Sequence, residues 1–396
     1  MEENFDDILG LVREDPSSDS LEEFCTLVSK EYSMNSSFST ELAKILAKSG
    51  QALSANSHFD IASTGGPASL TTLIPPLFLS SSGLSVSKLG VPGRPAGGID
   101  VMAQIPGFEY ELSVKEISEI LEESKFAHFN AGVNFTPLDA KIFKVRTLTN
   151  TKAIPSLVSA SILAKKLSSG VSHVGLDLRV YPDGNFGTTR AKAMENAIFF
   201  KDVARRLNIE ATVFITSVNE PPQDFVGRGE AILAIKKVLD GEWNQHITDC
   251  QNMAICIADK ANKAKIANTN KNDLKKVFIA HINSQGGDFQ GFLEKAHSTE
   301  KLHTNEVLAP ENGFIRYDQR KIRDAIVDEQ NTSKQAEEFC DPCGVIYRQP
   351  FGSFVREGQT LMTFRHQGSN PEKFKNKLDQ AVHVGKTPEN ESIGVI

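Results

Sequence analysis

A chain of 396 residues is long enough for two or three domains with sizeable buried cores. Charged residues make up 23% of it and hydrophobic residues 40%, with ordinary use of Gly and Pro, which excludes collagen-like and wholly disordered proteins. The 50 acidic and 43 basic residues leave a net charge of −7, which disfavours nonspecific binding to nucleic acid phosphates. We therefore expect a soluble globular protein without a nucleic acid partner.

The apolar and acidic stretches argue against a membrane or secreted protein. The apolar run Leu73–Leu79 is far shorter than the roughly 18 residues of a membrane span, and it contains two prolines. The sequence starts with the acidic residues Glu2, Glu3, Asp6 and Asp7, unlike the basic start of a secretory signal. We expect a cytoplasmic location and no membrane partner.

The five cysteines predict free thiols rather than disulfides or a metal site. Their number is odd and they are scattered along the chain, which is typical of a reducing compartment. Cys340 and Cys343 form one C-x-x-C pair, but a structural zinc site needs a second pair of ligands. The spacing of Cys250 and Cys256 does not supply that pair. We expect no bound metal.

The first part of the chain predicts short amphipathic helices. Up to about Ser54, apolar residues recur at intervals of three and four residues. At Phe59 and Ile61 the pattern changes to that of a strand, which leads through Ser63-Thr64-Gly65-Gly66 into a helical run at 70–79. A glycine-rich turn between a strand and a helix aims backbone N–H groups at an anion.

A second glycine-rich segment, Lys88 to Gly98, is predicted to be a loop because it is too irregular for a core element. Further on, strand and helix patterns alternate, which is typical of a parallel sheet covered by helices. The predicted helices are 154–167, 193–207, 229–239 and one through Val277 and Ile282, and the predicted strands are 174–180 and 211–218. A polar stretch lies at 262–272, and from Val307 onward short strands predict a small β-rich module.

Three polar residues in and before the predicted helix at 154–167 are candidates for a site. Ser161 and Lys165 are four residues apart and therefore project from one face of that helix. Arg146 ends the segment that starts at Leu138. The spacing alone is also typical of a solvated helix face with an ordinary surface arginine.

The sequence around these residues resembles the pyrimidine nucleoside phosphorylase (thymidine phosphorylase) family, over about residues 20 to 365. The resemblance rests on the strings Pro137-Leu138-Asp139-Ala140-Lys141, Ile154 to Leu167, Ser63-Thr64-Gly65-Gly66, Gly97-Gly98-Ile99-Asp100, Ile105-Pro106-Gly107-Phe108, Gln285-Gly286-Gly287-Asp288, and Val307-Leu308-Ala309-Pro310 with Gly313-Phe314. In that family, the residues at the positions of Arg146, Ser161 and Lys165 hold the pyrimidine base. The resemblance implies a pentosyltransferase that cleaves or forms an N-glycosidic bond. Phosphate or a sugar phosphate would be its co-substrate, with no other cofactor.

The match fails at residues on which the family's phosphate chemistry depends. Where the family has Lys-His before Ser-Thr-Gly-Gly, this chain has Ile61-Ala62, which removes a phosphate-binding cation and the usual general acid. The family's next residues, Val-Gly-Asp, are replaced by Pro67-Ala68-Ser69, and a later Val-Gly-Ser-Gly-Ala-Phe loop by Val180 to Phe186. A phosphate-binding serine of the family falls at Lys88 and a histidine at Arg94.

The resemblance places the anion site at Ser63, Thr64, Gly65, Gly66, Thr72, Lys88 and Arg94. On its own, the glycine turn is more typical of a tight turn, and Lys88 and Arg94 are equally typical of loop charges. His58, His128 and His173 have no partner spacing, so we expect them to be structural. Without the Lys-His pair, free phosphate is expected to bind weakly, with slow phosphorolysis of thymidine and uridine.

Three functions of different classes remain open. The leading one is phosphorolysis-type pentosyl transfer to or from a pyrimidine-like base. The second is phosphoribosyl transfer, because the same fold serves the anthranilate phosphoribosyltransferase family, whose Lys-His-Gly-Asn is here Lys88-Leu89-Gly90-Val91. Such enzymes hold a diphosphate with magnesium and carboxylates, for which Asn219-Glu220 is a poor substitute. The third is a degenerate protein that binds a nucleoside or base without catalysis.

The resemblance also implies an α/β fold of the nucleoside phosphorylase/phosphoribosyltransferase class II type, built in parts. Residues 1–57 and 134–168 would form a small all-helical domain. Residues 58–133 and 169–305 would form a larger α/β domain with a central mixed sheet, and 306–396 its C-terminal α+β module, rich in strands. The family further implies a homodimer that forms through the helical domain.

Overall fold

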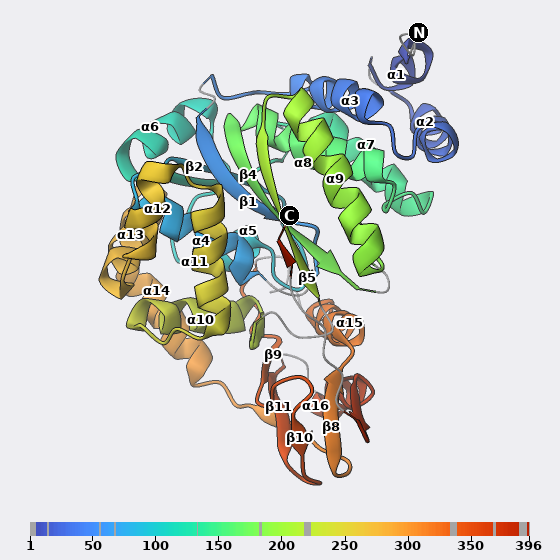
Figure 1. Ribbon diagram of the computed structural model, residues 1–396. Helices are drawn as coiled ribbons and strands as arrows, with labels where there is room; N and C mark the ends of the chain where they lie inside the picture. The colour runs from blue at the N-terminus through green and yellow to red at the C-terminus, as the bar shows by residue number, and fades with distance from the viewer. Residues whose placement is uncertain are drawn as a thin grey trace.

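The computed structural model describes residues 5–13, 16–54, 57–66, 69–132, 134–181, 184–217, 223–332, 339–366, 370–387 and 394–395. A sheet runs through the middle of the molecule with helices on both faces. A helical region lies at one end and a β-rich module at the other (Figure 1). No helix within these residues is long and apolar enough to cross a membrane.

The helical region is built from two segments that are far apart in the sequence. Polar caps start α2 and α3, where Ser17 and Asn35 accept hydrogen bonds from backbone N–H groups. The two segments meet where α3 packs on α8, and there Ser156 Oγ accepts a hydrogen bond from the Asn35 N–H at 3.0 Å. The helices are α1 (Asp6–Arg13), α2 (Ser18–Glu31), α3 (Ser36–Lys48), α7 (Pro137–Leu148) and α8 (Pro155–Ser168).

Six strands of the described residues form the central sheet, in the order β13-β5-β4-β1-β2-β3. All neighbouring pairs are parallel except β13 with β5, so the sheet is mixed. The strands are β1 (His58–Ser63), β2 (Val86–Gly90), β3 (Phe126–Asn130), β4 (Val171–Val180), β5 (Glu210–Ser217) and β13 (Gly394–Val395). From β1 the chain first adds β2 and β3 on one side of β1, and it later adds β4 and β5 on the other side of β1. In open α/β sheets, ligands bind at the carboxyl ends of the strands beside such a reversal.

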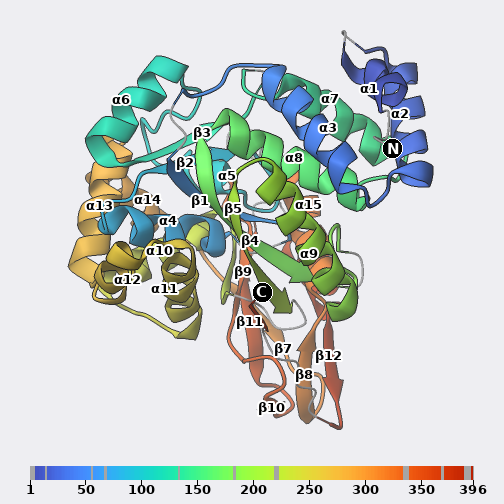
Figure 2. The ribbon, with the colours of Figure 1, turned by 45° about the horizontal axis from the view of Figure 1, so that its top comes forward.

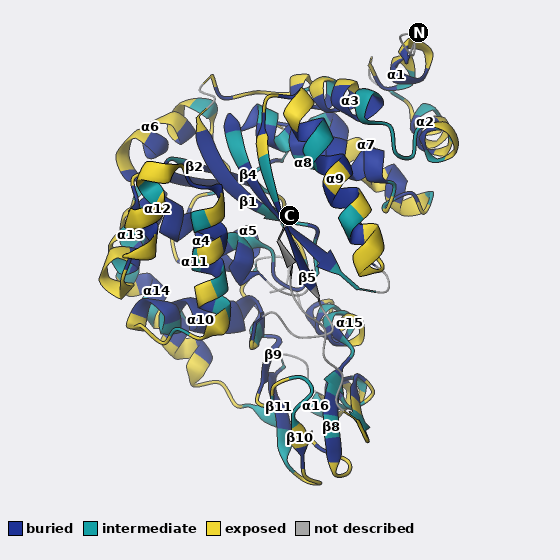
Figure 3. Cartoon of the chain, viewed as in Figure 1, coloured by how far each residue is buried: buried dark blue, intermediate teal, exposed yellow. Residues whose placement is uncertain are grey.

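Helices cover both faces of this sheet (Figures 1 and 2). Helix α9 and the helical region share a buried apolar cluster with β4 and β5. On the other face, α4, α10, α11 and α13 share a buried apolar cluster with β1 and β2. Figure 3 shows that the sheet and the helix sides that face it are mostly buried. The bounds of the remaining helices are α4 (Leu70–Ser81), α5 (Gly98–Met102), α6 (Val114–Ser124), α9 (Arg190–Arg206), α10 (Arg228–Asp240), α11 (Gln245–Ile257), α12 (Lys260–Ala267), α13 (Lys271–Ser284) and α14 (Phe289–Glu300).

The C-terminal module has a buried apolar cluster of its own, around two small antiparallel sheets. Its elements are β7 (Asn305–Leu308), β8 (Gly313–Tyr317), α15 (Gln319–Gln330), β9 (Gly344–Tyr347), β10 (Phe354–Val355), β11 (Thr360–Arg365), α16 (Pro371–Asp379) and β12 (Val382–Gly385). The module also takes in β6 (Phe225–Gly227) from the middle of the chain, which pairs with β9. Buried Arg365 contacts Glu230 of α10 and joins the module to the α/β core.

The expected fold class is confirmed, whereas one local expectation is wrong. Residues Lys88 to Gly90 are not loop: they end β2, where the backbone pairs with β3. The polar stretch at 262–272 contains α12, a helix in which Ile266 is the single buried residue, so its sequence has no apolar face to signal a helix. The division into three sequence-defined domains stays a prediction.

Two histidines are buried within this fold, where burial disfavours the charged form of the imidazole. Burial lowers the pKa of His281 to about 4. Burial, together with the positive charge of Lys88, lowers the pKa of His128 well below its ordinary value. In the unfolded chain both imidazoles take up a proton near pH 6.5. Between about pH 6.5 and pH 4 the unfolded chain therefore binds more protons than the folded one, and stability falls as the pH falls.

We expect His281→Asn to weaken this pH dependence. The imidazole Nδ1 of His281 contacts the Phe126 carbonyl at 3.0 Å, and an asparagine amide can donate a similar bond without titrating. The free energy of unfolding, measured with urea at pH 7 and pH 5.5, should drop less in the variant, by up to about 1.4 kcal/mol per pH unit. Equal drops in the two proteins would show that His281 is not held neutral.

Candidate active site

A cavity of about 600 Å³ opens at the carboxyl ends of β1 and β2, beside the reversal in strand order. One wall is the turn after β1 with the start of α4, and a second is the segment that follows β2. The helical region contributes the third wall through α8, and the C-terminal module the fourth through α15. The cavity therefore lies where all parts of the fold meet.

At the base of the cavity, one carboxylate holds two lysines. Lys88 at the end of β2 donates to Asp60 Oδ1 at 3.1 Å and to the Ile61 carbonyl at 2.8 Å. Lys166 of α8 donates to the other oxygen of Asp60. All three side chains are at least nine-tenths buried, and all three residues line the cavity.

The charge of this cluster favours an anion. Burial alone would raise the pKa of the Asp60 carboxyl, but the ammonium groups of Lys166 and Lys88 outweigh burial and lower that pKa. Burial lowers the pKa of Lys88, against the attraction of Asp60. With both lysines charged, the cluster carries one buried positive charge in excess, which is costly unless an anion lies beside it. An anion in the cavity supplies that compensation.

His128 lies beside this cluster, contrary to the structural role expected from the sequence. It is paired with Lys88 in the register of β2 and β3, and its ring lines the cavity. The ring is 1% exposed, and neither ring nitrogen has a hydrogen-bond partner in the described part of the chain. A Cβ on Gly98 would come within 2.8 Å of this ring, so the glycine leaves room for it. A neutral imidazole in this position can donate one hydrogen bond to an anion.

The glycine turn after β1, predicted to be part of an anion site, lines the cavity. Ser63, Gly65, Gly66 and Thr72 line the cavity, and both glycines have positive φ angles that other residues rarely adopt. Thr64 does not line it. The Thr64 hydroxyl instead accepts a hydrogen bond from the Arg179 N–H at 3.0 Å, so this residue anchors the turn to β4. Pro67 and Ala68, which replace the family's residues, lie outside the described residues.

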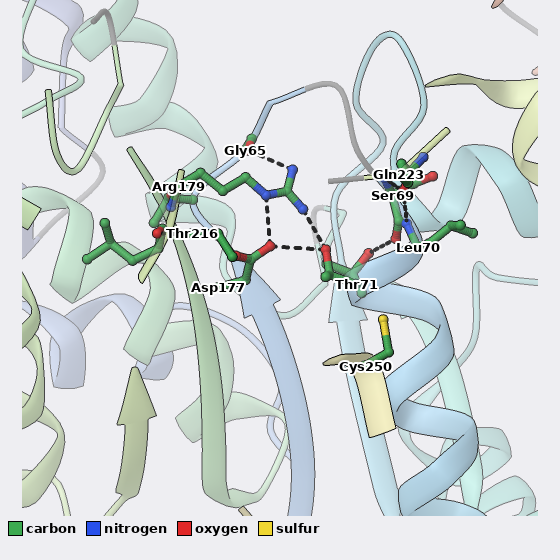
Figure 4. A network of polar contacts seen from close by, with 12 residues as sticks. Gly65, Ser69, Leu70, Thr71, Asp177, Arg179, Thr216, Gln223 and Cys250 are labelled. Carbon is green, nitrogen blue, oxygen red and sulfur yellow. Dashed lines mark hydrogen bonds and ion pairs between the residues drawn. The ribbon is translucent and has the colours of Figure 1, made fainter. Parts of the chain in front are cut away.

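A buried pair on β4 fixes the position of this turn (Figure 4). The Arg179 guanidinium donates to Asp177 Oδ2 at 2.8 Å, to the Gly65 carbonyl at 2.8 Å and to the Thr71 hydroxyl at 2.6 Å. Asp177 also accepts from Thr71 and from Thr216 of β5. Sequence reasoning missed this pair, although two charged residues at alternate positions of an apolar strand are an available signal of buried ion pairing.

Lys165 reaches the cavity, but Ser161 does not line it. The Lys165 ammonium contacts Asp139 of α7, and it donates to the hydroxyl and the carbonyl of Ser161 at 3.1 Å each. Asp139 stands in the string Pro137 to Lys141 that carries the family resemblance. Lys165 therefore lines the α8 wall together with Ile162, and Asp139 binds it from α7.

Arg146 lies outside the cavity lining, contrary to the expectation that its charge points into a cleft. Its side chain is 3% exposed, and the guanidinium donates to the carbonyls of Leu157 at 3.3 Å and Lys152 at 2.6 Å. These bonds tie α7 to the segment that enters α8. In this structure Arg146 positions the α8 wall rather than presenting a charge to a ligand.

Ile61, which stands where the family has a phosphate-binding lysine, does not line the cavity. Along β1 the side chains alternate: Asp60 and Ala62 line the cavity, whereas Ile61 is fully buried in the apolar cluster on the α4 face. A lysine introduced at position 61 would therefore have its Cβ in that apolar cluster rather than in the cavity. Ala62 alone therefore marks, in the cavity lining, the place of a polar group that the family has.

The second segment brings further cations to the cavity. Arg94 lines it and contacts Asn331 at the end of α15, so that α15 and this segment are joined. Three more cationic residues in the lining were not foreseen from the sequence: Lys152 before α8, and Arg320 and Arg323 of α15. Only folding brings these distant residues into one wall. Asn219 and Glu220, considered as a magnesium-binding pair, lie outside the described residues.

Comparisons with known proteins agree with this architecture. No protein-family model matches the chain. Pyrimidine-nucleoside phosphorylase of Geobacillus stearothermophilus is 24% identical over 388 residues, covering 90% of this chain and 86% of that protein. The enzyme of the same name from Bacillus subtilis is 24% identical over 338 residues, covering 81% and 77%. An anthranilate phosphoribosyltransferase variant from Saccharomyces cerevisiae, with Mg bound, aligns with a TM-score of 0.50 at 15% identity, covering 70% of this chain and 90% of that chain.

The fold is of the class II phosphoribosyltransferase type. Within that class, the chain is a distant homologue of the pyrimidine-nucleoside phosphorylases, as its sequence motifs predict.

The position of Arg146 predicts a structural role for its side chain rather than contact with a ligand, and the two roles can be told apart by experiment. We expect Arg146→Ala to lower the free energy of unfolding by about 2 to 4 kcal/mol, because it leaves buried carbonyls without donors. Lys144→Ala, on an exposed position of the same helix, is the matched control and should change little. Urea unfolding measures both. A variant as stable as the control, yet inactive, would assign Arg146 to ligand contact instead.

Proposed function

We propose that the protein transfers a pentosyl group between a pyrimidine-like base and a phosphate-type anion, by phosphorolysis or its reverse. The observation that carries the proposal is the cavity itself. It places the glycine turn and the buried cluster of Asp60, Lys88 and Lys166 in one space with Lys165, a residue that holds the base in the family resembled. The names of the curated relatives support the same reaction.

In this proposal the cations act where negative charge is held or develops. Lys88 and Lys166, together with the N–H groups of the glycine turn, hold the anion. His128 donates a hydrogen bond to it as a neutral imidazole, in place of the missing Lys-His pair. As the glycosidic bond breaks, negative charge develops on the base, and Lys165 stabilises that charge more than it stabilises the bound nucleoside.

The central test is release of uracil from uridine, measured with and without phosphate, and in the presence of EDTA because the proposal requires no metal. Slow, phosphate-dependent release is expected. Ala62→His returns an imidazole to the cavity lining and should raise the rate by up to about 100-fold, the lower end of the range for general acid catalysis. Release that is independent of phosphate would contradict the proposal. Reaction that requires phosphoribosyl diphosphate and magnesium would favour the alternative of phosphoribosyl transfer, and binding without turnover would favour a degenerate binding protein.

The charge of Lys165 provides a second test. Lys165→Met alone leaves Asp139 buried without its cation, which is destabilising, so the informative variant combines it with Asp139→Asn. We expect the rate of base release to fall by about 10- to 100-fold. The circular dichroism spectrum and the stability to urea should stay those of the unmodified protein. Lys144→Met, which changes an exposed lysine of α7, is the control. Full activity of the double variant would exclude Lys165 from the site.

We propose, as the family resemblance implies, a cytoplasmic homodimer that forms through the helical region. Phe143 and Leu148 of α7 support this interface, because 49% and 78% of their surfaces are exposed on that region. Replacing both with Glu should shift the mass in solution from dimer to monomer, as measured by light scattering at micromolar concentration. A monomeric mass for the unmodified protein would remove this interface.

A further inference from the structure

The segment 91–98, which follows β2, forms a wall of the cavity and is held by a buried carboxylate. The residues of this segment that line the cavity are Val91, Gly93, Arg94, Ala96, Gly97 and Gly98. Asp100 is fully buried and stands outside the cavity lining. Its Oδ2 accepts a hydrogen bond from the Gly93 N–H at 2.8 Å. A Cβ on Gly97 would lie 2.6 Å from the same oxygen, so the glycine leaves room for the carboxylate.

Arg228, the first residue of α10, binds the other oxygen of this carboxylate. Its Nε and Nη2 groups donate to Asp100 Oδ1 at 3.2 Å and 2.6 Å. The Arg228 carbonyl accepts a hydrogen bond at 2.8 Å from the side chain of Gln104, which follows α5. The Arg228 side chain is buried and does not line the cavity. Two charge-assisted hydrogen bonds thus fix the position of Asp100 from α10.

Asp341 of the C-terminal module extends these contacts into a closed network. Arg228 Nη1 donates to Asp341 Oδ2 at 2.6 Å, and Gln330 Nε2 donates to Asp341 Oδ1 at 2.9 Å. The same Gln330 amide donates to the Pro95 carbonyl at 2.8 Å. Asp341 and Gln330 are fully buried, and neither lines the cavity. The network therefore leaves the segment 91–98 at Gly93 and returns to it at Pro95.

The network also gives a structural place to the C-x-x-C pair. Asp341 stands between Cys340 and Cys343, and the backbone is held on both sides of it. Lys295 of α14 donates to the Cys340 carbonyl at 3.3 Å. A Cβ on Gly227 would lie 2.4 Å from the Cys343 carbonyl, so the chain here packs closely against the start of α10. This packing presents the Asp341 carboxylate to α10.

A second buried ion pair joins α10 to the C-terminal module without reaching the cavity wall. Arg365 Nη1 of β11 lies 2.5 Å and 2.7 Å from the two carboxylate oxygens of Glu230, two residues after Arg228. Within the described residues, neither Glu230 nor Arg365 forms a hydrogen bond with the segment 91–98. This pair therefore attaches the module to the α/β core and serves as a matched control for the network.

We infer, on the basis of the proposed function, that Arg228, Asp341 and Gln330 are positioning residues for anion binding. They hold the segment 91–98 where it closes the cavity, without touching the ligand. The segment carries a cation of the cavity lining, and its backbone adjoins the ring of His128. A shift of its backbone would thus disturb two groups that face a bound anion, and a misplacement of about 1 Å is costly in such a site.

Amide hydrogen exchange of the full chain tests the positioning without any ligand. Gln330→Met removes two hydrogen bonds without removing a charge, and Asp341→Asn removes the charge that binds Arg228. We expect faster exchange in the segment 91–98 of both variants and unchanged exchange in β4 and β5. Gln330→Met decides the test if Asp341→Asn does not fold.

The control for this experiment is the double variant Glu230→Gln, Arg365→Met. It removes both charges of the other ion pair between α10 and the module, and it should leave exchange of the segment 91–98 as in the unmodified protein. Exchange of the segment that stays unchanged in Gln330→Met, or that rises equally in the control, would overturn the inference.

Inorganic phosphate is the probe for the effect on the cavity. Its dissociation constant, measured by isothermal titration calorimetry, should rise about 10-fold in Gln330→Met, the effect of about one lost hydrogen bond to the anion. The control double variant should keep the dissociation constant of the unmodified protein. A purely structural role of the network would lower the stability to urea and leave the dissociation constant unchanged, which would overturn the inference.

The outcomes separate this inference from the proposed function. Phosphate-dependent release of uracil from uridine, with unchanged phosphate affinity in Gln330→Met, would leave the proposed function standing and overturn the positioning role. If the unmodified protein binds no phosphate, the proposed function fails. The exchange measurement then decides by itself whether the network holds the segment 91–98.

Discussion

The cavity depends on one buried carboxylate that binds two lysines from different parts of the chain. Asp60 on β1 accepts hydrogen bonds from Lys88 of the neighbouring strand and from Lys166 of the helical region. The contact therefore joins α8 to the sheet and at the same time sets the charge of the cavity. Loss of Asp60 would leave two buried cations facing each other, a larger penalty than loss of either lysine. The attachment of α8 and the charge of the cavity thus rest on the same interaction.

A second buried network decides the shape of the anion site rather than its charge. Arg179 holds the Gly65 carbonyl and is held by Asp177, so the turn after β1 is positioned by β4, its parallel neighbour. The family motif Ser-Thr-Gly-Gly is retained, while the cations around it have changed. Positive charge that the family carries just before this motif comes here from the end of β2, from α8 and from α15. The interaction between a cation and an anion depends on their distance and not on where the cation stands in the sequence, so cations from other segments can replace the lost ones.

Predictions made from the sequence were most accurate where the evidence was local. The apolar spacing of 154–167 and the alternation of 211–218 correspond to α8 and β5 within a few residues. They failed where a residue's role depends on what packs against it. Arg146 is a site residue by the family resemblance, but it donates to the carbonyls of Lys152 and Leu157 at the entry to α8. His128 has no partner in sequence, yet the pairing of β2 with β3 places it beside Lys88.

The sequence by itself determined the elements, the α/β class, the family resemblance and the glycine turn, because periodicity and short motifs act between residues close in the chain. Only the tertiary structure decided which charges face the cavity. Ile61 and Ala62 are adjacent in sequence but lie on opposite faces of β1, and Arg320 and Arg323 reach the site from the C-terminal module. The strand order and the packing of α8 and α15 on it produce these juxtapositions. Both arise from contacts between segments that are distant in the sequence, which no local pattern encodes.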